Sequence, residues 1–262
     1  MLKLLRKCIK SALMEAGSQK NDALFVGTYL LRLLRVLILL SLWRIILADK
    51  GQAGGISLDS ILTYTLIAEV FGETLNCRIR LFWALWEGSI AYRFVRPMGI
   101  VSQFASEMVG EWLWGFLLFS LPLFVLAPVL GVQPLPASSE LALWFVISLL
   151  LAIVNGLGLE FIFALLMLSL ENSIYSVNRV RQAAITLLSG ALIPLTFYPW
   201  GIGKVLEWSP FAQTASAPLL IYTSRGDPLF LVALQIGWAV VLWIGFALLW
   251  CKQREQLVSQ GG

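Results

Sequence analysis

Long apolar runs separated by short polar segments dominate the chain. A straight bilayer crossing needs about 20 predominantly apolar residues, and four runs reach that length: 23–47, 58–77, 100–127 and 229–250. A fifth run, 141–170, is longer than a straight crossing requires and is predicted to tilt or to extend beyond the bilayer. The pattern therefore predicts an all-α polytopic membrane protein.

A sixth apolar segment, AAITLLSGALIPLTF at 183–197, is too short for a straight crossing and contains Gly190 and Pro194. Proline removes a backbone donor and disrupts a helix, so we predict a span that breaks near these two residues. Beyond the break, short proline-punctuated helices would dip back into the membrane, shielded by protein or by a polar cavity. The sequence thus predicts six transmembrane helices, with a broken, re-entrant region over 190–228 before the last one.

Lysine and arginine are distributed unequally over the segments between these spans. With six spans and an internal N-terminus, thirteen of the 19 basic residues fall in the inside segments 1–22, 78–99, 171–182 and 251–262. The outside segments hold Lys50, Lys204 and Arg225. Because basic residues are enriched in cytoplasmic loops, we predict that both termini are cytoplasmic.

Residues 1–22 carry a helical pattern of their own. The apolar side chains that share one helical face are Leu2, Leu5, Ile9, Leu13 and Ala16. A second face carries Lys3, Lys7 and Lys10. This predicts an amphipathic entry helix on the inner leaflet, the alternative being a basic tail.

Composition excludes several other classes of protein. The chain is 59% hydrophobic and only 13% charged, whereas about a quarter of the residues in a soluble domain are charged. The basic residues are scattered rather than arranged in a stripe, so nucleic acid is not an expected partner. There is no histidine, and the three cysteines lack metal-ligand spacing, so no metal site is expected. The sequence also lacks a G-x-x-x-x-G-K-[ST] nucleotide-binding loop, so energy must come from another chain or from an ion gradient.

Charges inside the predicted spans need partners, since each costs about 2.5–3.5 kcal/mol at a helix centre on insertion scales. At a rise of about 1.5 Å per residue, Arg32 lies about 14 Å along its span and Glu69 about 12 Å from the inner end of the next. This matching depth favours an Arg32–Glu69 ion pair, with Arg35 or Glu73 as the alternate partner. We expect such a pair to join the first two spans structurally.

Three further carboxylates, Glu107, Glu111 and Glu160, have no basic residue in their own predicted spans. They are expected to pair across subunits or to line a wet cavity, which makes them candidates for a substrate pathway. The small residues in Asn155–Gly158 predict close helix packing in the middle of the fourth span.

The segment 78–99, between the second and third spans, is richer in aromatic and charged residues than a simple turn requires. Phe82, Trp83 and Trp86 could bury apolar surface against a partner protein. Glu87 and Arg93 could pair with charges on that partner, which would set register and specificity.

Two backbone features shape the same segment. Gly88 permits a sharp bend, and Pro97 disfavours helix at Arg96, which would separate a loop helix from the third span. The alternative is an ordinary interfacial loop, with its aromatic side chains among lipid headgroups and its arginines on phosphates.

Three stretches resemble the permease subunits of ABC-2 type (type-2 exporter) ABC transporters, most closely the small, single-domain, six-span kind. LLSLWRIIL at 39–47 resembles the end of their first span, and EGSIAYRFVRP at 87–97 resembles their cytoplasmic loop. SGALIPLTFYPWGIGKVLEWSPF at 189–211 resembles their glycine- and proline-rich signature before the final span. The resemblance covers nearly the whole chain and implies one transmembrane permease domain over 1–262.

The resemblance also implies partners. A cytoplasmic ABC ATPase dimer would bind ATP and Mg and would dock on a coupling helix within 79–97, so this chain would bind no cofactor and would not itself be an enzyme. A second permease subunit, identical or similar, would complete the transporter in a bacterial inner membrane. By alternating access it would export a drug, peptide, lipid or glycan.

Within this scheme the predicted outer gate comprises Gly190, Pro194, Pro199, Pro210 and Phe211. The alternative is a lid that caps the dimer on its outer side. Two other functions stay open at the level of sequence: an intramembrane enzyme that uses Glu107 and Glu111 as paired carboxylates, and a channel or assembly factor that is not driven by ATP.

Overall fold

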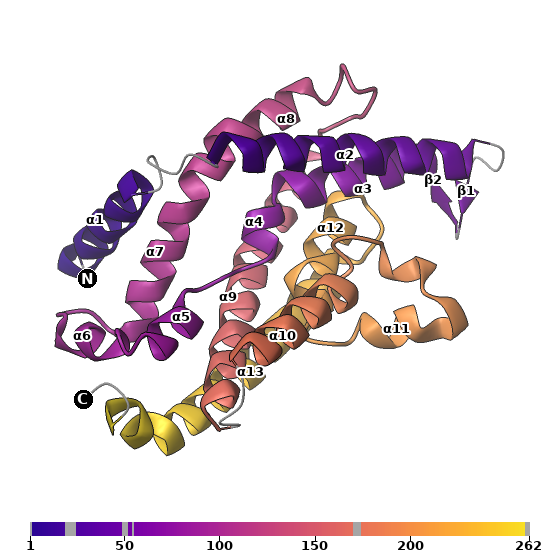
Figure 1. Cartoon of the computed structure of the whole chain (residues 1–262). Helices are drawn as coiled ribbons and strands as arrows, with labels where there is room; N and C mark the ends of the chain where they lie inside the picture. The colour runs from indigo at the N-terminus through magenta and orange to yellow at the C-terminus, as the bar shows by residue number, and fades with distance from the viewer. Residues whose placement is uncertain (1, 19–24, 49–51, 54, 170–173, 260–262) are drawn as a thin grey trace.

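The computed structural model describes residues 2–18, 25–48, 52–53, 55–169 and 174–259. It is predominantly helical, with one short antiparallel hairpin (Figure 1). The α-helices are α1 (Leu2–Ser18), α2 (Phe25–Leu47), α3 (Leu58–Val70), α4 (Gly72–Leu75), α5 (Leu81–Trp86), α6 (Ile90–Val95), α7 (Ile100–Gly115), α8 (Leu121–Leu126), α9 (Ser139–Ser169), α10 (Ile174–Leu188), α11 (Ile202–Leu206), α12 (Ser216–Tyr222) and α13 (Pro228–Ser259). The shorter elements are the hairpin strands β1 (Gln52–Ala53) and β2 (Ile56–Ser57), the π-helical turn η2 (Phe116–Ser120), and the 3-10 turns η3 (Leu195–Phe197), η4 (Pro199–Gly201) and η5 (Ala212–Thr214).

Three helical segments are long and apolar enough to cross a membrane: Ile100–Leu126, Ser139–Met167 and Pro228–Gln253. They coincide with the predicted spans 100–127, 141–170 and 229–250. The first of them runs continuously from α7 through η2 into α8. The first predicted span is helical as α2, whose 23 residues include three arginines. The mostly helical membrane fold expected from the hydrophobic pattern is thus observed.

The second predicted span, 58–77, is divided into two helices. α3 ends at Val70, and Phe71 leaves helical geometry with φ −97° and ψ 13° before α4 begins at Gly72. Glycine lowers helix propensity and leaves room beside the backbone. The Arg32 guanidinium lies beside Gly72, its Nη2 at 3.8 Å from where a side-chain carbon would stand, which is an ordinary van der Waals contact.

The segments at the two ends of the helices form two separate sets of contacts. At one end, the Lys7 ammonium of α1 donates to the Pro97 carbonyl at 3.2 Å, and Phe94 of α6 stacks on Trp250 of α13 at 6.3 Å. At the other end, Arg225 donates to the Gly55 carbonyl at 3.1 Å, and Arg44 donates to the Leu130 carbonyl. Figure 1 shows α1, α6 and the last turns of α13 at the end opposite the β hairpin.

Close packing occurs where the fourth predicted span carries its small residues. A side-chain carbon at Gly156 would stand 2.8 Å from the Cys77 sulfur, and one at Gly158 would stand 3.0 Å from Leu242. The absence of side chains at both positions lets α9 approach the α4–α5 connection and α13. The packing predicted for Asn155–Gly158 is therefore present.

α1 packs on α7 through a small-residue face. The Ala12 carbonyl lies where a side chain at Gly110 would project, and the Trp114 indole N–H donates to the Ala16 carbonyl at 2.7 Å. The apolar side chains that this contact leaves exposed, each by half or more, include Leu5, Ile9 and Leu13. An exposed apolar stripe beside basic residues is the pattern of a helix that lies in a membrane interface.

Candidate functional site

The 78–99 loop folds into two short helices, α5 and α6, joined by a tight turn at Glu87–Ser89. Gly88 occupies the left-handed region with φ 68°, which glycine adopts without steric cost. Arg96 is extended with φ −72° and ψ 143°, as expected for the residue before Pro97. The bend and the helix stop predicted from the sequence are therefore both present.

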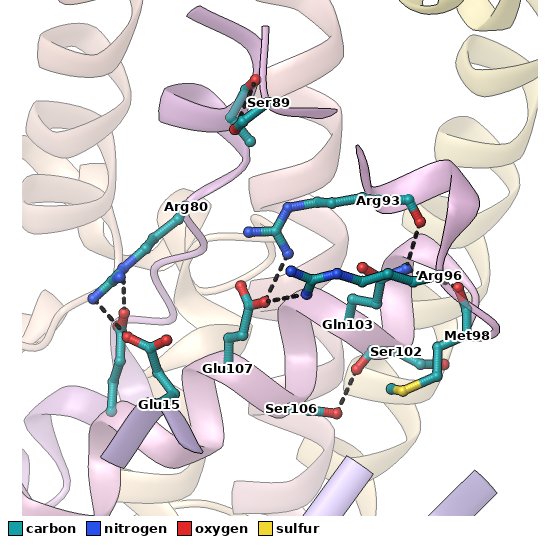
Figure 2. A network of polar contacts seen from close by, with 12 residues as sticks. Glu15, Arg80, Ser89, Arg93, Arg96, Met98, Ser102, Gln103, Ser106 and Glu107 are labelled. Carbon is teal, nitrogen blue, oxygen red and sulfur yellow. Dashed lines mark hydrogen bonds and ion pairs between the residues drawn. The ribbon is translucent and has the colours of Figure 1, made fainter. Parts of the chain in front are cut away.

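Arg80 attaches the beginning of this loop to two helices at once. Its Nη2 lies 2.9 Å from a carboxylate oxygen of Glu15 on α1 (Figure 2). Its Nε lies 2.6 Å from a carboxylate oxygen of Glu111 on α7. The Arg80 side chain is half exposed, so solvent screens the pairs and each contributes about 0–1 kcal/mol. Their geometric role is to hold α1, the loop and α7 together.

A second attachment holds the end of the loop. The Arg93 guanidinium donates to Glu107 at 2.8 Å, and Arg96 lies 3.7 Å from the same carboxylate oxygen (Figure 2). Arg93 also stands over the Phe104 ring at 4.1 Å, and Gln103 donates to the Arg93 carbonyl at 2.8 Å. Arg93 and Glu107 are largely buried, so this attachment is the less screened of the two.

Glu107 and Glu111 thus lie one turn apart on α7 and hold the two ends of the loop. The sequence left open whether they pair across subunits or line a wet cavity, because no basic residue lies in their own span. The structure supplies arginines from the adjacent loop of the same chain. Their role in a substrate pathway stays a prediction, and these ion pairs give it no support.

Glu160 is the third carboxylate of that group and is also paired within the chain. It contacts Arg181 of α10, and both side chains are almost fully buried, at 1% and 4% exposed. Glu160 also accepts a bond from the Ile79 backbone N–H at 3.3 Å. It therefore joins α9, α10 and the beginning of the 78–99 loop.

The ion pairs between the first two predicted spans join other partners than predicted. Arg32 pairs with Glu73, and Arg35 pairs with Glu69, while Arg32 reaches only the Glu69 carbonyl, at 3.4 Å. The predicted Arg32–Glu69 pair is wrong because the antiparallel register of α2 against α3 and α4 displaces the partners by about one turn. The alternate partners named from the sequence are the ones used.

The exposed surface of the loop lies mainly on α6 and the turn before α7. Tyr92 is 76% exposed and Val95 is 85% exposed, and Glu87 and Pro97 are also exposed. Trp83 of α5 is 44% exposed. The side chains of Phe82 and Trp86 lie outside the described residues. Tyr92 and Val95 were not predicted as docking residues, although their i, i+3 spacing puts them on one helical face.

The profile of ABC-2 family transporter proteins matches residues 33–261 of the chain. The chain belongs to the ABC-2 transporter family. No curated protein matches it. The match contains α7, α9, α13 and the 78–99 loop, so membership of the family covers both the membrane helices and the site described above. An ABC-2 family protein is a membrane component of a transporter, associated with an ABC ATPase.

This ABC-2 family chain also breaks its helices in the segment before α13. α10 ends at Leu188, and Gly190 follows with φ 77°, its carbonyl accepting a bond from the Tyr64 hydroxyl at 2.8 Å. A side-chain carbon at Gly190 would stand 3.0 Å from Leu195 and 3.1 Å from Ser216. Glycine is therefore required here both by backbone conformation and by space.

The remaining predicted gate residues lie along the same segment. Pro194 is buried ahead of η3, and Pro199 is the first residue of η4. Pro210 and Phe211 are half-buried, and the Phe211 ring lies 6.4 Å from that of Phe163 on α9. The segment thus reaches well along α9, and its action as a gate stays a prediction.

Buried amides fix this segment between α9 and α13. Gln235 of α13 donates to the Gln213 carbonyl at 2.9 Å and accepts from the Ser148 hydroxyl at 2.8 Å. Asn155 donates to the Gln235 carbonyl at 3.1 Å. All four residues are at most 1% exposed. Because unpaired polar groups are costly in an apolar setting, this network holds the broken segment in one position.

The described residues of the family member contain no group of three or more histidine, cysteine, aspartate or glutamate side chains placed to hold a metal ion. Glu107 and Glu111, the carboxylates considered for an intramembrane enzyme, are held by arginines instead.

Proposed function

We propose that the chain is the transmembrane subunit of an ATP-driven ABC exporter, energised by a separate ATPase dimer that docks on residues 79–97. The observation that carries this proposal is the combination of family membership with the build of the 78–99 loop. The loop presents exposed Tyr92 and Val95 outward and is tied by Glu107 and Glu111 to α7. A surface that receives force needs both features.

We propose six membrane crossings with both termini in the cytoplasm. The two sets of contacts support this topology, because segments that the topology puts on one side contact one another. The loop at 78–99 meets α1 and the end of α13 through Lys7 and Phe94. The hairpin at the opposite end meets the connection before α13 through Arg225.

The ion pairs supply a route for coupling. When the ATPases bind ATP and close, they would displace the loop, and the arginines at its two ends would carry the displacement to α7 and α1. A second permease subunit, identical or similar, would move in the opposite sense, and the pair would open outward past 190–228. The cargo would be amphipathic, a drug, peptide, lipid or glycan, exported across a bacterial inner membrane.

The test uses two matched valines. Val95 on α6 and Val129 on the loop after α8 are 85% and 83% exposed. Val95→Asp should disrupt apolar docking, whereas Val129→Asp changes the same side chain at the opposite end. The tagged wild type and both variants would be purified in mild detergent from the native host, with co-purified protein identified by mass spectrometry and ATP hydrolysis measured.

Docking on α6 is supported if an ATPase co-purifies with the wild type and with Val129→Asp. The amount of ATPase recovered with Val95→Asp should be at least tenfold lower. A wild type that emerges alone and without ATP hydrolysis would remove the energy source that the proposal requires. Equal recovery with both variants would place the docking surface elsewhere on the chain.

A further inference from the structure

A small pocket lies between α12, the segment before it and the first turns of α13. Its lining includes Glu207, Trp208, Gln213, Phe230, Leu231 and Leu234. The pocket offers about 50 Å³ to water-sized groups, and by that measure one water needs about 10–15 Å³. It is therefore far too small for a whole drug-sized molecule, whose pocket is about 300–1,000 Å³, and is the size of a small headgroup.

The pocket is lined by the polar side chains of Glu207, Gln213 and Ser216, and the first two offer acceptor oxygens. The Gln213 side-chain nitrogen donates to the carbonyls of Glu207 at 2.7 Å and Ser209 at 3.4 Å, which fixes the orientation of the amide. Its oxygen is fully buried and has no hydrogen-bond donor among the described residues. A buried acceptor without a donor is rare in native proteins and calls for an explanation.

Glu207 adds a carboxylate to the same pocket. The ion pairs of the described residues do not include Glu207. Burial raises its pKa, while the charge of nearby Lys204 acts in the opposite direction. When ionised, this carboxylate presents a negative charge that attracts a cationic ligand.

The rest of the lining suits a cation attached to an apolar body. The Trp208 and Phe230 rings meet edge to face with centroids 5.4 Å apart, and aromatic faces attract ammonium groups. Leu231 and Leu234 line the same pocket and can contact hydrocarbon. The combination selects for positive charge and against negative charge.

We infer that this pocket binds the primary ammonium group of an amphipathic molecule, with Glu207 and Gln213 as its acceptors. The ammonium could belong to a lipid headgroup of the outer leaflet or to a free alkylamine. The inference goes beyond the proposed function, since it requires only the chain itself and no ATPase.

Binding would be measured by calorimetry on the full chain in nanodiscs at about pH 8, with hexylamine as the probe and hexanoate as the matched anion. Glu207→Gln removes the charge and keeps the shape. Glu140→Gln, an exposed glutamate at the first turn of α9, is the control. Thermal unfolding of each variant establishes that it is folded.

The expected result is saturable binding of hexylamine, no binding of hexanoate, and at least a tenfold rise in Kd for Glu207→Gln but not for Glu140→Gln. Nanodiscs that contain phosphatidylethanolamine should weaken hexylamine binding if the lipid headgroup is the ligand, and should leave it unchanged if a free amine is. Equal binding of hexylamine and hexanoate, or an unchanged Kd in folded Glu207→Gln, would overturn the inference. Loss of ATPase docking on α6 would not affect it.

Discussion

Arg93 donates to Glu107 across 2.8 Å and so joins the end of the 78–99 loop to α7. The loop and the span are consecutive in sequence, yet this bond makes them move together beyond their covalent link. Both side chains are largely buried, so the bond is less weakened by salt and solvent than the exposed pairs are.

Glu107→Gln should destabilise the protein by about 1 kcal/mol, because the amide oxygen can still accept from Arg93 but the negative charge that strengthens the bond is lost. Glu87→Gln changes an exposed glutamate of the same loop and should have little effect. Thermal unfolding of the two purified variants makes the comparison. Equal melting temperatures would mean that the Arg93 attachment contributes nothing measurable.

Glu160→Met should cost about 3–5 kcal/mol, since it leaves the buried Arg181 guanidinium without its carboxylate. Changing both residues to Met should recover most of that loss, because well-packed apolar residues often replace a buried pair at no net cost. Arg179→Met, on the exposed face of α10, serves as the single-arginine control. Unfolding in denaturant would be followed for these three variants and the wild type. A double variant as unstable as the single one would contradict the pairing.

The ion pairs between the first two predicted spans can be tested by exchanging charges. Arg32→Glu alone sets two carboxylates together and should destabilise α2 against α4, while adding Glu73→Arg should restore stability. Adding Glu69→Arg instead should restore none of it, because that position faces Arg35. Thermal unfolding of the three variants distinguishes the observed pairing from the one that helix depth alone suggests.

Gly110→Val should displace α1 from α7, because the Ala12 carbonyl occupies the space that the new side chain needs. Overpacking of this kind costs about 1–3 kcal/mol. Gly237→Val is the matched control, since no atom lies within 4 Å of the added carbon on α13. Proteolysis of α1 should accelerate in the first variant only. A similar rate in both would mean that α1 is held by other contacts.

Periodicity and composition anticipated the features that depend on local sequence. The apolar runs marked the three long membrane helices. Gly88 and Pro97 marked a bend and a helix stop, and Gly190 marked the end of α10. Each of these follows from backbone sterics or from hydrophobic length, so a single residue or run is enough to predict it.

The partners of the charged residues were harder to predict from the sequence. Glu107, Glu111 and Glu160 were recognised as carboxylates that need partners, but the arginines that meet them belong to other elements. The unpaired acceptor oxygen of Gln213 gave no signal in the sequence, because its lack of a donor depends on the folded surroundings of that side chain.

The sequence by itself determined that this chain lies in a membrane, where its apolar helices run, and where they break, because bilayer thickness and backbone geometry act on contiguous residues. Only the tertiary structure decided which arginine meets which carboxylate. An ion pair requires two side chains within a few ångströms, and a shift of one helical turn, as between Arg32–Glu69 and Arg32–Glu73, is enough to change the partner.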